Sequence, residues 1–434
     1  MKLWIESAHQ SLTQPGGDVV KVFTTEEQFL AILASSPPGG VEGQVPAAQV
    51  ADGAARMLEP RMYSSAMSPD AAAEEVLATL PAGAHVPFSI LQVEGGNRAR
   101  LVECNAPPLF LARGGGLILP PVLEEETAQG HLVRKCQFLL QAGDHLAMVS
   151  EGYVRARGWS RRWGWQDIAI SIKRWTDTGC DAEQLLGALV RMHRRLAEGP
   201  APSIAEGPAP SAAEGEASQP GSGQAPRPGS GQAGQDVTVI AMHVRPIRTV
   251  TVWTGPPSDP AQDAVALQKL MAEPGVRVIC GDTTAQIAAR LLGTALEMEP
   301  RPEGGADKAG RVYSPAGSTH PPSTTRRHPW AEVPPISRLS GVGLVTEGLV
   351  TLEKARERLA KAKRVSDLPP GKDGATRLAR VLLAADKVHL IVGLAVNPAQ
   401  AADAAHTVPL RQVVIEQLVR DLKSRDKLVS LEYV

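Results

Sequence analysis

Short runs of alternating apolar and polar residues dominate the first 245 residues of the chain. Most of these runs are bounded by Gly, Pro, Asn or Asp, and this pattern is typical of antiparallel strands with one buried face. Apolar residues at helical spacing occur in four further windows. Many strands with a few flanking helices predict an α+β domain. The expected strands cover 3–5, 19–23, 29–33, 88–93, 99–103, 109–112, 138–140, 146–149 and 237–244, and the expected helices cover about 47–58, 70–79, 165–176 and 181–196.

From about residue 247 the pattern changes to strands that are each followed by a helix. Strands that alternate with helices favour a parallel sheet covered by helices. The sequence therefore predicts a second domain over 246–434, a three-layer α/β domain with a mostly parallel sheet. Its expected strands cover 249–253, 276–280 and 388–392, and its expected helices cover about 260–272, 283–293 and 409–424.

Two stretches are nearly free of large apolar residues. Residues 198–234 repeat the short units AEGPAPS and PGSGQA, and the stretch at about 299–329 has the same character. Such segments bury too little surface to offset their conformational entropy, so we expect both to be disordered inserts. Because a strand is expected at 237–244, the first insert interrupts a domain that spans 1–245.

Composition and charge exclude several classes of protein. Lys and Arg number 45 against 46 Asp and Glu, so a formal net charge of −1 provides no field that attracts nucleic acid. No run approaches the ~18 apolar residues of a membrane helix, and the N-terminus meets a charge too early for a secretory signal. The four cysteines form no CxxC pair, which argues against structural zinc and a disulfide framework. We expect a cytoplasmic protein with no nucleic-acid or membrane partner.

Carboxylates stand at the ends of several expected strands, at Asp18, Asp144, Glu151 and Asp236. An acidic residue beside glycine at a strand end is most often part of a turn. Carboxylate oxygens are also the ligands that hard divalent cations prefer. For each residue taken alone, both interpretations stay open.

Five segments in this order resemble the metal-dependent PPM (type 2C) protein phosphatases, specifically the SpoIIE type of bacterial sporulation. The resemblance covers about residues 1–245 and implies an α/β/β/α sandwich of two antiparallel sheets between helices. It also implies two Mn²⁺ or Mg²⁺ ions at one edge, and a water between them that attacks a phosphoserine or phosphothreonine. The segments are Gly-Gly-Asp at 16–18, Ala-Ser-Ser-Pro-Pro-Gly-Gly at 34–40, Asn-Ala-Pro-Pro-Leu-Phe at 105–110, Gly-Asp through Ser-Glu-Gly at 143–152, and Asp-Val-Thr-Val at 236–239.

The metal ligands that the resemblance implies are only partly present. Asp18 occupies the Gly-Gly-Asp position, and Glu151 replaces an aspartate. The bridging aspartate of the family falls on Ser35, and the first aspartate of the last motif falls on Gln235, which leaves Asp236 in the second place. Two divalent ions repel each other without a bridging anion, so we expect no stable two-ion centre. One Mn²⁺ or Mg²⁺ held by Asp18, Glu151 and Asp236 stays open.

Two functions follow from this reading. One is a serine/threonine phosphatase whose hydrolysis is weak or lost. The alternative is a catalytically silent pseudophosphatase of the same fold that acts as a regulatory, partner-binding or sensor protein. In both cases the expected partner is a phosphoprotein or a regulatory protein.

Two further segments carry candidate binding chemistry. Residues 155–165 combine four arginines with three tryptophans, which suits either a solvated surface beside a core Trp165 or a phosphopeptide-docking surface. Gly281, Asp282, Thr283 and Thr284 lie between a strand and a helix, where backbone amides can bind a phosphate. Thr and Asp are also ordinary helix N-caps. Gly255-Pro256-Pro257 and Asn397-Pro398 follow other strands and are candidates to line the same binding site, although both are also common in turns.

Overall fold

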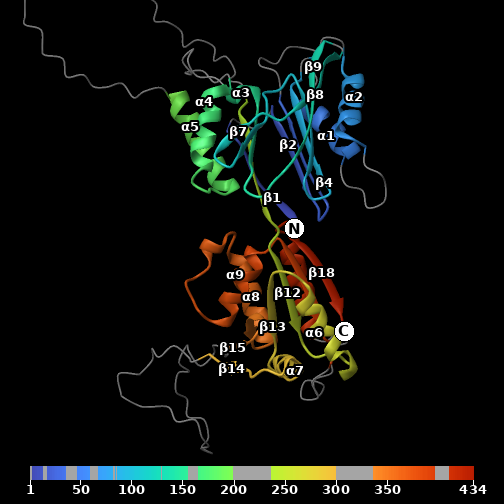
Figure 1. The fold of residues 1–434 in the computed structure, drawn as a ribbon, viewed down its shortest axis with the longest axis vertical. Helices are drawn as coiled ribbons and strands as arrows, with labels where there is room; N and C mark the ends of the chain where they lie inside the picture. The colour runs from blue at the N-terminus through green and yellow to red at the C-terminus, as the bar shows by residue number, and fades with distance from the viewer. Residues whose placement is uncertain are drawn as a thin grey trace, which may run out of the picture. The chain divides into compact units, whose positions relative to one another are not determined.

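The computed structural model describes the chain except for residues 1, 13–16, 36–45, 59–66, 82–83, 85, 129, 155–164, 199–235, 300–335 and 396–409. The described residues form two compact units, Met1–Pro246 (unit 1) and Ile247–Val434 (unit 2). Both are seen in Figure 1. The expected inserts at 198–234 and 299–329 lie almost entirely outside the described residues. Their first residues are described, Glu198 as the last residue of a helix and Glu299 as the partner of two arginines.

Unit 1 contains two antiparallel sheets, as the sequence predicts. The five-stranded sheet has the order β1-β11-β10-β6-β7, and the six-stranded sheet has the order β2-β3-β4-β5-β9-β8. The sheets are made of β1 (Leu3–Ser11), β2 (Val19–Thr24), β3 (Gln28–Ala34), β4 (Phe88–Glu94), β5 (Arg98–Cys104), β6 (Phe110–Arg113), β7 (Gly116–Ile118), β8 (Val122–Ala128), β9 (His131–Leu139), β10 (His145–Val149) and β11 (Thr238–Pro246).

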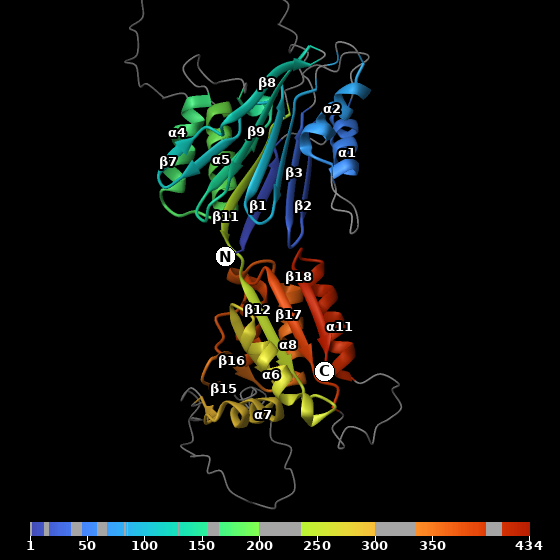
Figure 2. The same ribbon diagram turned by 45° about the vertical axis from the view of Figure 1, so that its right-hand side comes forward.

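Helices cover the outer face of each sheet in unit 1 (Figures 1 and 2). One apolar core joins the two sheets, a second joins α1 and α2 to the six-stranded sheet, and a third joins α4 and α5 to the five-stranded sheet. The order of layers is therefore helix, sheet, sheet, helix. The helices are α1 (Ala47–Leu58), α2 (Pro69–Thr79), α3 (Glu151–Val154), α4 (Trp165–Thr176) and α5 (Ala182–Glu198).

The β3 sequence explains how one strand serves two cores. Phe29, Ala31 and Leu33 face the core between the sheets. Leu30, Ile32 and Ala34 face the helices α1 and α2 on the other side. A strand covered on both faces has a continuous apolar run because neither set of side chains reaches water. This burial anchors the strand end at Ser35.

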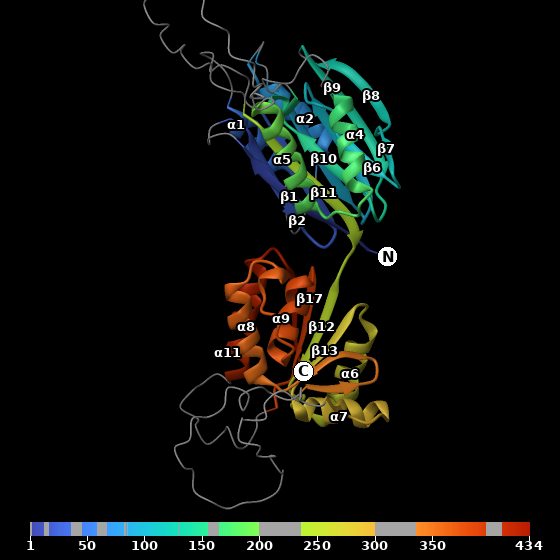
Figure 3. The ribbon, with the colours of Figure 1, turned by 90° about the vertical axis from the view of Figure 1, so that its left-hand side faces the viewer.

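Unit 2 is a three-layer α/β domain. Its seven-stranded sheet has the order β14-β15-β16-β13-β12-β17-β18. The strands from β16 to β18 in this order are parallel, whereas β14 and β15 pair antiparallel at one edge. Helices α6 and α7 pack on one face, and α8, α9 and α11 pack on the other (Figure 3). The sheet is mostly parallel, as predicted, with an antiparallel edge.

The elements of unit 2 are β12 (Thr249–Thr254), η1 (Pro260–Gln262), α6 (Asp263–Ala272), β13 (Val276–Cys280), α7 (Asp282–Leu292), β14 (Glu297–Met298), β15 (Ile336–Leu339), β16 (Val342–Thr346), α8 (Leu349–Lys361), η3 (Val365–Asp367), α9 (Gly374–Ala384), β17 (Lys387–Val392), α11 (Leu410–Lys423) and β18 (Leu428–Tyr433).

Several elements escape the sequence analysis. The edge strand β8 reads VLEEETA and is largely exposed, so it lacks the apolar alternation of a half-buried strand. The strands β15, β16 and β18 and the helices α8 and α9 are also absent from the expected set. In α8, the spacing of Leu352, Ala355 and Leu359 fits a helix with one buried face, and this signal is visible in the sequence.

All four cysteines are buried and free, so no disulfide links the described elements. Within the described part of the chain, none of the helices has the length and apolar character needed to cross a membrane.

Candidate functional site

Four candidate positions lie beside strand ends in unit 1, two in each sheet. Asp18 immediately precedes β2 and Ser35 immediately follows β3, and these strands pair antiparallel with Val19 opposite Ala34. Glu151 opens α3 after β10, and Asp236 lies just before β11. The antiparallel pairing of β10 with β11 places Val149 opposite Val239, so the two residues lie at one end of that ladder. Each sheet thus contributes two positions.

The Gly17 backbone brings the two pairs together. A Cβ atom added at Gly17 would lie 1.4 Å from Oδ2 of Asp236, so the Asp236 carboxylate packs directly against the residue before Asp18. No side chain larger than hydrogen fits there without moving Asp236. Both carboxylate oxygens of Asp18 are buried from solvent. The fold therefore brings Asp236 against Gly17, the residue before Asp18, although the two segments are distant in sequence.

Ser150 fixes the strand ends that carry Asp236 and Glu151. Its backbone N donates to Thr238 O at 3.0 Å, and its Oγ accepts from Thr238 N at 2.9 Å. The same hydroxyl donates to the backbone O of Asp236 at 3.3 Å. Ser150 is 1% exposed, so these bonds are shielded from water. The Ser-Glu-Gly segment thus has a structural reason for its serine, which sequence reasoning did not identify.

Ser35 is neutral and buried at the position where the resemblance implies a bridging carboxylate. Its side chain is 5% exposed, and its backbone N donates to Pro87 O at 2.8 Å. Gln235, the other neutral position, lies outside the described residues. Within the residues that the structure describes, no three His, Cys, Asp or Glu side chains are grouped so that they could hold a metal ion.

Asp144, a carboxylate candidate from the sequence, has a structural role instead. It lies at the other end of β10 from Glu151 and is fully buried. Arg113 donates to both of its oxygens, from Nε at 2.7 Å and from Nη2 at 2.6 Å. The backbone N of Gln141 adds a third bond at 2.8 Å. These contacts fix the turn before β10, so the interpretation of Asp144 as a turn residue is correct.

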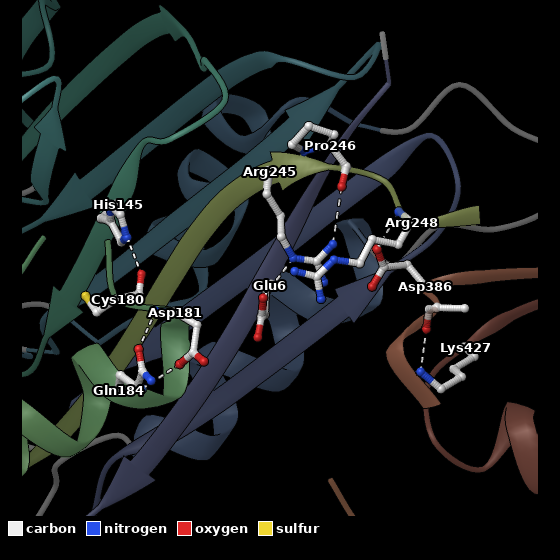
Figure 4. A network of polar contacts seen from close by, with 11 residues as sticks. Glu6, His145, Cys180, Asp181, Gln184, Arg245, Pro246, Arg248, Asp386 and Lys427 are labelled. Carbon is white, nitrogen blue, oxygen red and sulfur yellow. Dashed lines mark hydrogen bonds and ion pairs between the residues drawn. The ribbon is translucent and has the colours of Figure 1, made fainter. Parts of the chain in front are cut away.

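Other polar contacts of unit 1 lie near His145, at the end of β10 that is opposite to Glu151 (Figure 4). Arg245, near the end of β11, donates from Nε to Glu6 Oε2 at 2.9 Å and from Nη1 to Pro246 O at 3.3 Å. His145 Nε2 bonds to Cys180 O at 2.6 Å, and the His145 ring stacks on His243. Burial lowers the pKa of His243, and the neighbouring His145 lowers it further. This network links β1, β10 and β11 far from the Asp18 end.

The segment 105–110 is held by a buried ion pair that sequence reasoning missed. Glu103 is 3% exposed and accepts from Leu109 N at 2.6 Å, while Arg134 lies 3.0 Å from its other oxygen. Arg134 also donates to Ala106 O at 3.1 Å. Burial raises the pKa of Glu103 to about 7, although Arg134 and the Leu109 amide oppose the shift. The only signal in the sequence is a carboxylate at the end of an expected strand.

Asn105 gives the same segment its backbone shape. It adopts a positive φ of 48°, which asparagine tolerates better than most residues. Its Oδ1 accepts from Leu132 N at 2.9 Å, and its Nδ2 lies 3.0 Å from His131 Nδ1. The asparagine of the Asn-Ala-Pro-Pro segment is therefore explained by local structure.

Trp165 begins α4 and stacks on Phe110, with ring centroids 5.0 Å apart. Its Nε1 donates to Pro108 O at 3.3 Å. The interpretation of Trp165 as a packed residue at a helix start is confirmed. The arginines at 155, 157, 161 and 162 lie outside the described residues, and the docking surface stays a prediction.

In unit 2, Gly281, Asp282, Thr283 and Thr284 join β13 to α7. Gly281 has a φ of 134° and donates to Thr346 O at 2.8 Å. Asp282 and Thr283 are exposed in the first turn of α7, whereas Thr284 is buried. No side chain caps this helix N-terminus. The expected strand-loop-helix geometry is present, and phosphate binding stays a prediction.

Comparison with known proteins gives likeness in structure only. No family model matches the chain, and no curated protein sequence matches it. The phosphatase domain of the cell fate determinant SpoIIE from Bacillus subtilis is similar at 16% identity and TM-score 0.33, over 56% of this chain and 92% of that chain. The catalytic domain of the serine threonine protein phosphatase PstP, in complex with 2 manganese ions, is similar at 15% identity and TM-score 0.34, over 56% of this chain and 100% of that chain. The SiaA-PP2C domain of Pseudomonas aeruginosa is similar at 12% identity and TM-score 0.37, over 55% and 84%. At these values no residue role is transferred to this chain.

Proposed function

We propose that unit 1 is a PPM-like phosphatase domain that binds a phosphoprotein or regulatory partner and hydrolyses phosphoesters weakly or not at all. The observation that carries the proposal is the buried, neutral Ser35 at the strand end beside Asp18. The resemblance implies a bridging carboxylate at that position. A pair of divalent cations without a bridging anion is strongly repulsive in a partly buried site.

The remaining carboxylates support the proposal of a site with reduced charge. The Asp236 carboxylate packs against Gly17, the residue before Asp18. Glu151 directly follows Ser150, whose hydrogen bonds to Thr238 and Asp236 fix this strand end. Carboxylate oxygens are the donors that Mn²⁺ and Mg²⁺ accept, and fewer carboxylates offset less positive charge, so we expect at most one ion. We therefore expect any metal binding to be weak and to involve Asp18 and Asp236.

Metal titration and phosphatase assays on the full chain test the proposal. Calorimetry with Mn²⁺ should give weak or no binding, and hydrolysis of p-nitrophenyl phosphate and of a phosphoserine peptide should be slow or absent. Asp18→Asn should remove the residual metal binding. Glu27→Gln, an exposed carboxylate change in the β2–β3 turn, is the matched control and should leave it unchanged. Fast, Mn²⁺-dependent turnover that Asp18→Asn abolishes would contradict the loss of activity.

Restoration of charge is the sharper experiment. Ser35→Asp combined with Gln235→Asp should raise Mn²⁺ affinity by about tenfold or more, since each added carboxylate contributes a charge-assisted ligand. Ser35→Asn with Gln235→Asn provides a control of similar size without charge. Equal affinity of the two double variants would show that these positions do not face the ion.

An active phosphatase is the second candidate. The packing of Asp236 against Gly17 favours it, because this contact brings one carboxylate against the segment that carries Asp18. A single ion that orients the phosphate would leave residual hydrolysis. The two candidates differ in the Asp18→Asn variant, which lowers turnover only if the natural chain has turnover to lose.

A further inference from the structure

The parallel strands of unit 2 reverse their order between β12 and β17. From β12 the chain moves outward through β13 to β16, and it then returns to β17 and β18 on the other side of β12. The connections lie on opposite faces of the sheet, with α6 and α7 on one face and α8, α9 and α11 on the other (Figure 3). In open α/β sheets, ligands bind outside the carboxyl ends of the strands at such a reversal.

Glycines occupy the first position after each of the strands β12, β13 and β17. These are Gly255, Gly281 and Gly393. A Cβ atom at Gly393 would lie 2.2 Å from Gly255 O, and one at Gly281 would lie 4.0 Å from Gly255 N. Gly255 and Gly281 also have positive φ angles of 77° and 134°. The carboxyl ends of the three strands therefore converge as bare backbone, in which Gly281 N and Gly393 N already donate to Thr346 O and Thr254 O.

The guanidinium group of Arg411 lies over this backbone. A Cβ atom at Gly255 would lie 2.3 Å from Arg411 Nη1. The same nitrogen donates to Gly393 O at 2.8 Å and to Ala395 O at 3.3 Å. Arg411 thus reaches the loops that follow both β12 and β17, which are the two strands on either side of the reversal.

Arg411 places a positive charge in the first turn of α11. It is the second residue of α11, a helix with no acidic residue in its first turn, so the guanidinium adds to the positive end of the helix dipole. Among the residues that the structure describes, none provides a carboxylate in an ion pair with Arg411. Burial lowers the pKa of this guanidinium. A partly desolvated cation at a helix N-terminus favours a bound anion.

Thr284 provides a second, independent indication of a ligand. It is fully buried, and its Oγ1 has no hydrogen-bond partner among the residues that the structure describes. This oxygen lies 3.1 Å from the position that a Cβ atom of Gly281 would take, so the hydroxyl is directed at the loop between β13 and α7. A buried hydroxyl without a partner is costly, and a bound group that supplied a partner would remove this cost.

We propose that this crevice binds a nucleotide, with its phosphate at Arg411 and Gly255 and its sugar hydroxyls at Asp282. Asp282 is exposed at the end of β13, the strand next to β12. A carboxylate at this position accepts hydrogen bonds from a ribose diol in doubly wound folds. Glu347, at the end of β16, adds a second carboxylate at this edge of the sheet, and the two negative charges disfavour a free phosphate ion.

Calorimetry on the full chain tests the proposal with ATP, AMP and inorganic phosphate as probes. At least one nucleotide should bind, and more tightly than inorganic phosphate. Arg411→Met should weaken nucleotide binding by about tenfold or more, because a charge-assisted contact is lost. Arg411→Lys keeps the charge but not the planar guanidinium group. Its nucleotide affinity should lie between those of the natural chain and Arg411→Met.

Arg425→Met is the matched control. Arg425 also donates to two backbone carbonyls, those of Leu359 and Ala362, but it lies after the C-terminal end of α11. Its loss should destabilise unit 2 without changing nucleotide affinity by more than about twofold. Circular dichroism of each variant identifies any failure to fold.

Asp282→Asn separates the two halves of the proposed ligand. This substitution should weaken the binding of the nucleotides. It should leave the affinity for inorganic phosphate unchanged or slightly higher, since a negative charge is removed. Absence of binding by all three probes, or equal nucleotide affinity of the natural chain and Arg411→Met, would overturn the proposal. Unchanged nucleotide affinity in Asp282→Asn would overturn the assignment of the sugar to this residue.

Discussion

The buried carboxyl of Glu103 should make the stability of unit 1 fall as the pH rises. Burial raises its pKa from 4.5 to about 7, even though Arg134 opposes the shift. Between these two values the folded chain retains the Glu103 proton and the unfolded chain has lost it. The folded state then binds more protons than the unfolded state, so the free energy of unfolding decreases with increasing pH.

The size of the effect follows from the two pKa values. One pKa unit corresponds to about 1.4 kcal/mol, so a rise from 4.5 to about 7 corresponds to roughly 3 kcal/mol. The stabilising contribution of the neutral carboxyl is complete below about pH 4.5 and is lost by about pH 8.

Urea unfolding of the natural chain and of Glu103→Gln, measured from about pH 4.5 to about pH 8, isolates this contribution. Glutamine keeps the acceptor for the Leu109 amide but does not titrate. Hydrogen exchange of the β5 and β9 amides reads unit 1 separately from unit 2. The natural chain should lose roughly 3 kcal/mol relative to the variant as the pH rises.

Parallel pH profiles for the natural chain and Glu103→Gln would refute the reasoning. Glu125→Gln is the control, since Glu125 pairs across the strands with Arg134 but is exposed. Its profile should follow that of the natural chain. A profile of Glu125→Gln that matches Glu103→Gln instead would assign the effect to Arg134 rather than to the buried carboxyl.

Three further predictions concern stability and reactivity. Asp144→Ala should destabilise unit 1 by about 3–5 kcal/mol in urea unfolding, because it leaves the Arg113 guanidinium without its buried partner; a loss near zero would contradict this. Ser68→Ala should cost about 1 kcal/mol, measured in the same way, because the Ser68 hydroxyl accepts from Ala71 N and caps α2, whereas Ser68→Asp should retain most of the stability. Burial raises the pKa of the Cys280 thiol to about 12, so a thiol reagent should modify it only after unfolding; rapid labelling of the native chain would show that β13 opens.

Local sequence patterns predict much of the fold. The run at 29–33 predicts β3, and the apolar spacing at 181–196 predicts α5, because side-chain burial imposes the period of each element. The change from strand runs to strand-helix pairs near residue 247 predicts two classes of domain for the same reason. Edge strands such as β8 escape this logic, since an exposed strand has no buried face to leave a pattern.

The sequence also determines which carboxylates stand at strand ends, but not what they meet. Asp18, Asp144 and Asp236 have similar local surroundings of glycine and strand residues. Only the pairing of the two sheets sets Asp236 against Gly17, and only the pairing of β6 with β10 gives Asp144 its Arg113 partner. The same holds for Arg411 over Gly255, which depends on the reversal of strand order in unit 2. Local patterns specify elements because burial acts residue by residue, whereas a site is specified by contacts between distant segments that form only when the sheets close.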